Sequence, residues 1–133
     1  MRRHRAHLAA AGMCLAGCLG VSAVPAMALR MDATTRTFAT CTGRLSALME
    51  HQWLLAPAEA EVTRHHRHRM IELLQAVMPQ GGARDVLSLR IEAKFAQALL
   101  LTRATFNADA GDAAQAGAIS DRMLAHCEAL LAQ

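Results

Sequence analysis

The stretch TTRTFATCTGRLSALMEHQWLL, residues 34–55, decides the fold. Its apolar side chains recur at alternating steps of three and four residues, through Phe38, Cys41, Leu45 and Leu48. This period places them on one face of an α-helix. We therefore predict a helix that buries this face against other helices.

Three more helices are predicted beyond this stretch. The second begins at Pro57, since proline is favoured in a first turn, and the sequence PQGG at 79–82 ends it. The third covers residues 83–107, and the fourth follows the turn at 108–112, with Asp112 expected as its N-cap. Short loops make consecutive helices antiparallel, so residues 29–133 are predicted to form one all-α domain, an up-down-up-down four-helix bundle.

Counting residues from the turns predicts which side chains share a layer of this bundle. The third helix would turn one apolar stripe inward: Leu87, Ile91, Phe95, Ala98, Thr102 and Phe106. The predicted layers are Cys41, Met70, Ile91 and Cys127; then Leu45, His66, Phe95 and Met123; then Leu48, Val62, Ala98 and Ile119.

Cys41 and Cys127 share the first of these layers. In an exported protein, two buried cysteines at matching heights favour a disulfide over two free thiols. The sequence therefore predicts a Cys41–Cys127 bridge between the first and last helices.

The first 28 residues, MRRHRAHLAAAGMCLAGCLGVSAVPAMA, have the pattern of a secretory signal peptide with cleavage after Ala28. Two alternatives remain. Leu15–Cys18 matches a bacterial lipobox that would place a lipid on Cys18, and the apolar run 8–28 could be retained as a membrane anchor. We expect a periplasmic or secreted protein, or one anchored to the envelope by lipid. Contact with a membrane is expected only if Cys18 is lipidated or the leader is retained.

The net positive charge of the whole chain belongs to this leader. Three of the fourteen Lys and Arg residues lie in it, and all eleven Asp and Glu residues follow it. Residues 29–133 therefore carry no formal net charge. Nucleic-acid binding depends on a surplus of cations against phosphates, so we exclude nucleic acid as a partner.

The segment RHHRHR, residues 64–69, is the richest in groups that could bind a metal. His65 and His68 share an outward ridge with Glu61 and Glu72, where a divalent transition metal could bind. The simpler interpretation is a solvated ridge of Glu–His pairs, because three arginines surround it. His66 lies instead on the apolar stripe and is expected as a core or boundary histidine. We expect no cofactor, and the metal site remains the alternative.

No catalytic motif is recognisable from residue spacing, so we expect a non-enzymatic protein. A surface for an unknown protein partner is predicted instead. Trp53 and Leu54 end the first helix, and Ile71 and Met78 point away from the core line of the second. The predicted function is an interaction protein of the cell envelope, and the alternative is a periplasmic metal-handling protein that uses the His/Glu ridge.

Overall fold

A computed structural model describes residues 31–132, so the leader, its cleavage position and Cys18 lie outside the described residues. The part described folds into four α-helices and contains no strand. Helix α1 spans Ala33–Leu55, α2 spans Pro57–Val77, α3 spans Ala83–Phe106 and α4 spans Ala110–Leu131. The prediction of an all-α fold with four helices is therefore confirmed for residues 31–132.

Side-chain caps fix where α1 begins. The Asp32 carboxylate accepts a hydrogen bond from the Thr35 backbone N–H at 2.8 Å, which satisfies one of the unpaired donors of the first turn. This bond and the Thr35 hydroxyl hold the pKa of Asp32 below its ordinary value. Thr35 Oγ1 also lies 3.0 Å from the carbonyl oxygen of Val77, so the start of α1 is tied to the end of α2.

The N-cap of α4 is Asp109 and not Asp112. The Asp109 side chain accepts a hydrogen bond from the Asp112 backbone N–H at 2.9 Å. Asn107 accepts from the Asp109 N–H at 3.0 Å, which turns the chain soon after α3 and starts α4 early. Asp112 therefore lies in the first turn of α4 and pairs with Arg103 of α3.

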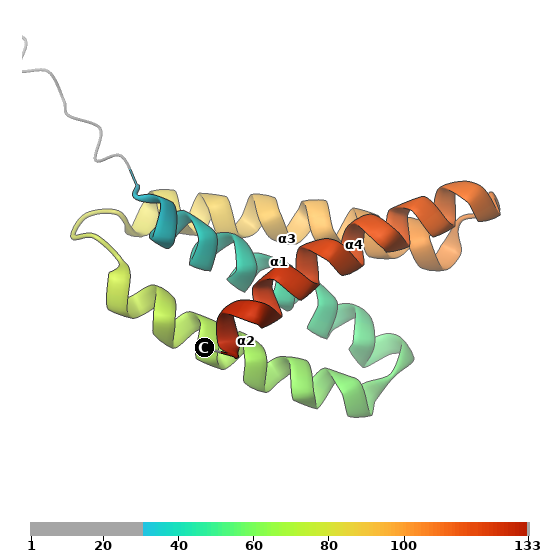
Figure 1. Cartoon of the computed structure of the whole chain (residues 1–133), viewed down its shortest axis with the longest axis horizontal. Helices are drawn as coiled ribbons and strands as arrows, with labels where there is room; N and C mark the ends of the chain where they lie inside the picture. The colour runs from blue at the N-terminus through green and yellow to red at the C-terminus, as the bar shows by residue number, and fades with distance from the viewer. Residues whose placement is uncertain (1–30, 133) are drawn as a thin grey trace, which may run out of the picture.

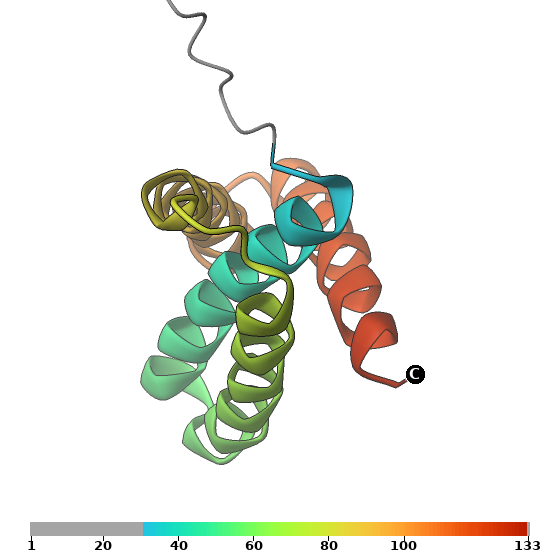
Figure 2. The same cartoon turned by 90° about the vertical axis from the view of Figure 1, so that its left-hand side faces the viewer.

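Helix α1 is the centre of the fold. It packs along both α2 and α3, whereas the backbones of α2 and α3 do not approach each other closely. Leu74 of α2 and Val86 of α3 nevertheless share one small cluster with Ala39 of α1. Helix α4 packs mainly on α3, and it also contacts α1 and α2. Consecutive helices reverse direction (Figure 1), but in Figure 2 α3 is seen almost end-on while α1 and α2 run obliquely to it. The bundle is therefore splayed around α1. None of the four helices is long and apolar enough to span a membrane.

Gly43 allows α1 to cross α3 closely. A Cβ atom at this position would lie 2.3 Å from the carbonyl oxygen of Arg90 and 3.0 Å from the Cβ of Ala93. Only glycine on one helix and a small residue on the other permit this approach. The crossing point therefore determines which face of α3 is turned inward.

The core confirms part of the predicted layers. Cys41, Met70 and Cys127 lie together in one buried cluster, which also contains Leu45, Leu124 and Leu131. A smaller cluster of Ala39, Leu74 and Val86 lies beside Met31 and Phe38.

The predicted inward stripe of α3 is wrong. Leu87, Ile91, Phe95 and Phe106 are exposed, and the helix buries a different set: Val86, Ala93, Gln97 and Leu101. The reason is that α3 is apolar on two faces, and the face with the small Ala93 fits the crossing at Gly43. On α2, Val62 is also exposed rather than layered. His66 is half-buried, which corresponds to the boundary position of the two that were expected.

Candidate binding surfaces

The two cysteines form the predicted disulfide. Cys41 of α1 and Cys127 of α4 are joined with their Cα atoms 5.4 Å apart, and both side chains are buried. The prediction from layer counting is confirmed. Because both sulfur atoms are bonded and shielded from water, neither serves as a nucleophile or a metal ligand while the bridge is intact.

The His/Glu ridge of α2 consists of two separate pairs. His65 Nε2 lies 3.5 Å from Glu61 Oε1, and His68 Nε2 lies 3.3 Å from Glu72 Oε1. Glu61 also accepts a hydrogen bond from Arg64, which lowers the pKa of the Glu61 carboxyl. Within residues 31–132, no three His, Cys, Asp or Glu side chains gather closely enough to hold a metal ion. The structure therefore brings each histidine to one carboxylate, and does not bring all four groups together.

The four predicted partner-binding residues do not form one surface. Trp53 and Leu54 are 52% and 80% exposed at the turn between α1 and α2. Met78 is exposed at the opposite end of α2, directly after the last residue of that helix. Ile71 is half-buried between them. Trp53 and Leu54 remain a small apolar group at one end of the molecule.

A larger apolar surface lies on α3. Its large side chains, 45–65% exposed, follow one another along one side of the helix, and we call them the α3 outer face: Leu87, Ile91, Phe95, Leu99 and Phe106. Leu87 and Ile91, at one edge of this face, also line a pocket that α3 shares with α1 and α2. At 100° per residue the five side chains occupy an arc of about 120°, roughly opposite the buried face. Sequence reasoning identified four of the five as core residues and missed Leu99. The apolar signal was present, but we assigned it to the wrong side of the helix.

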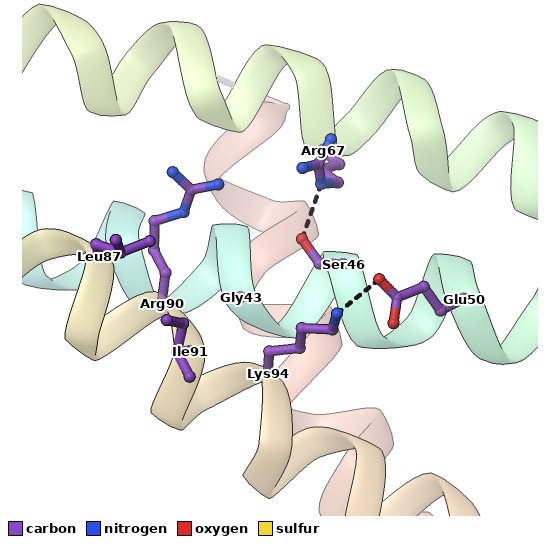
Figure 3. A pocket seen from close by; sticks show the side chains of 8 residues that line it. All are labelled: Gly43, Ser46, Glu50, Arg67, Leu87, Arg90, Ile91 and Lys94. Carbon is purple, nitrogen blue, oxygen red and sulfur yellow. Dashed lines mark hydrogen bonds and ion pairs between the residues drawn. The ribbon is translucent and has the colours of Figure 1, made fainter.

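A polar pocket of about 170 Å³ lies where α1, α2 and α3 meet. Arg67 of α2 and Arg90 of α3 approach it from opposite sides (Figure 3). Arg67 Nε donates to the Ser46 hydroxyl at 2.8 Å, and Lys94 Nζ pairs with the Glu50 carboxylate at 2.7 Å. Partial burial and the charge of Arg67 lower the pKa of Arg90.

This pocket is lined by three cations and one carboxylate, so an anion between Arg67 and Arg90 would relieve their mutual repulsion. Spacing along the chain could not reveal the pocket. Its residues come from three helices, and each alone has the pattern of a solvated charged face.

Comparison with known proteins gives no relative, since no protein-family model, curated protein or solved structure matches the chain. A proposal about function therefore depends on the surfaces described above.

Proposed function

We propose that the protein is a non-enzymatic interaction protein of the cell envelope and that the α3 outer face binds its protein partner. The observation that carries this proposal is the exposure of Leu87, Ile91, Phe95, Leu99 and Phe106 along one helix. A helix that is apolar on both faces is normally covered on both. Contiguous exposed apolar patches of this size commonly mark protein-binding sites.

Two further features support the proposal. The cysteines, the strongest nucleophiles among residues 31–132, are joined in a buried bridge, and this favours a structural role for them. The signal-peptide pattern of residues 1–28 supports a location in the envelope, where such a disulfide is stable. Trp53 and Leu54 offer a second, smaller contact at the end of α1.

Site-specific photocrosslinking in the host cell tests this function. A benzophenone amino acid in place of Phe95 should form a crosslinked product of defined mass, because this side chain would lie against the partner. The matched control carries the probe in place of Arg122, an exposed residue of α4, and should give little product. Equal products at both positions, or none at Phe95, would contradict the proposal.

Metal handling by the His/Glu ridge is the second candidate. The observation in its favour is that His65 and His68 are both well exposed, each beside a carboxylate, so an incoming ion could reach them. Calorimetric titration with Zn²⁺ should then show stoichiometric binding, and the double variant His65→Ala/His68→Ala should abolish it. The matched control is His126→Ala, on the exposed surface of α4, which should bind Zn²⁺ as the wild type does. Binding that survives the double substitution would exclude this ridge.

A further inference from the structure

We infer that the partner of the α3 outer face is a second copy of this chain, with the two α3 helices packed antiparallel across a two-fold axis. This inference rests on the proposed function, because it uses the same face. A two-fold interface joins a surface to itself, so the surface must be complementary to its own rotated copy. The order of side chains along α3 meets this condition.

The pairing register follows from the centre of the apolar stripe, which lies between residues 96 and 97. In an antiparallel pair centred there, residue i lies opposite residue 193 − i of the second copy. Phe95 then faces Ala98, and Ile91 faces Thr102, so a large side chain meets a smaller one near the axis. At the ends of the stripe, Leu87 faces Phe106. This alternation of large and small side chains lets two helices interlock.

Charges along the same register are also complementary. Glu92, at the edge of the stripe, falls within one turn of Arg103 of the second copy. The two-fold axis repeats this pair, so two opposite-charge pairs would border the apolar contact. Such borders favour one register over others.

The exposed area is sufficient for a dimer of modest affinity. A fully exposed large apolar side chain presents about 200 Å², so the five residues, at 45–65% exposure, present on the order of 500–600 Å² per copy. Covering both faces removes roughly 1,000 Å² from water, at the lower limit for a specific interface. Interfaces of this size are typical of weak, transient complexes, so we expect a dissociation constant in roughly the micromolar range. The zero net charge of residues 29–133 adds no overall repulsion.

Sedimentation velocity between about 1 and 200 µM tests the inference on the exported, oxidised protein. The wild type should shift from monomer to dimer over this range, and Phe95→Glu should remain a monomer throughout. The matched control is Val62→Glu, which places the same charge at a similarly exposed apolar position on α2 and should dimerise as the wild type does. A wild type that is monomeric at 200 µM, or a control that also fails to dimerise, would overturn the inference.

A cysteine at position 98 tests the register itself. In the proposed pair the two Cα atoms of residue 98 are offset by about 4.5 Å along the helix axes, which is compatible with a disulfide across the two-fold axis. Ala98→Cys should form a covalent dimer on oxidation, whereas Ala118→Cys, on exposed α4 surface, should not. A wild-type dimer without this crosslink would refute the antiparallel register.

The photocrosslinked product distinguishes failure of the dimer from failure of the proposed function. A product at Phe95 with twice the mass of the chain supports both. A product of another mass, together with a monomeric wild type, overturns the dimer and leaves the interaction function standing. A monomer that gives no product overturns both.

Discussion

Removal of the Cys41–Cys127 bridge measures how far the fold depends on the covalent link between α1 and α4. The bridge spans 86 positions of the sequence, so it closes most of the described chain into a loop. On the chain-entropy model, a loop of this length stabilises the folded state by about 4.5 kcal/mol. Because α4 packs mainly on α3, the bridge is also a principal restraint between α4 and α1.

The loss of stability can be divided into two parts. Reduction of the wild-type protein breaks the bridge but keeps both sulfur atoms in the core, so it should remove about 4.5 kcal/mol from the free energy of unfolding. The double substitution Cys41→Ala/Cys127→Ala also deletes buried atoms beside Leu45 and Met70, and we expect it to cost about 1–2 kcal/mol more. A domain of this size has about 5–15 kcal/mol in total, so the variant should lie close to unfolding.

Urea denaturation followed by far-ultraviolet circular dichroism at 25 °C supplies the measurement. The oxidised wild type, the wild type in a phosphine reductant and the double variant are compared under the same conditions. In thermal scans the reduced protein should melt about 20 °C or more below the oxidised protein. If the reduced and oxidised proteins differ by less than about 1 kcal/mol, the reasoning from loop closure is refuted.

Three further predictions concern packing and capping. Gly43→Ala should lower the free energy of unfolding by about 2–4 kcal/mol in urea titrations, because its methyl group would collide with α3. The matched control is Gly117→Ala, where the added Cβ atom would have its nearest neighbour at 3.8 Å. This variant should change stability little or raise it by up to about 1 kcal/mol. Equal losses of stability in Gly43→Ala and Gly117→Ala would contradict the close crossing at Gly43. Ser120→Ala should lower the free energy of unfolding by about 1–3 kcal/mol, because it removes the hydrogen-bond partner of the buried Gln97 amide, which lies at 2.7 Å. The double variant Gln97→Leu/Ser120→Ala, which also removes the unpaired amide, should recover part of this loss. If it recovers none, the loss does not come from an unpaired buried group. The pKa of Asp32 is lower in the folded state than in the unfolded state. Its contribution to stability is therefore present above the unfolded pKa of about 4 and is lost as the pH falls through the folded value. Urea midpoints of the wild type and Asp32→Ala should differ at pH 7 and converge in strong acid.

The sequence predicts the elements and the bridge well because both follow from local rules. Turn residues such as Pro57 and the glycines after Pro79 define the ends of helices, and the helical period aligns Cys41 with Cys127. The orientation of α3 is different. Its two apolar faces give equal signals in a hydrophobic period, and the choice between them depends on side-chain volume at a contact with another helix. Gly43 supplied that information in the sequence, as a glycine within a helical stretch, but its partner on α3 was not apparent.

The outward position of the large apolar side chains on α3 has a physical meaning. Small residues such as Ala93 face inward, where close helix crossing needs little volume, and large ones such as Phe95 face outward. A sequence selected only for folding as a monomer would gain from a polar residue in place of Phe95, because exposed phenylalanine contributes nothing to a monomer's core and promotes aggregation. The inner face of α3 is therefore suited to folding and the outer face to association. Substitutions on the two faces should separate accordingly, with Ala93→Leu lowering the stability of the monomer and Phe95→Glu lowering only its association.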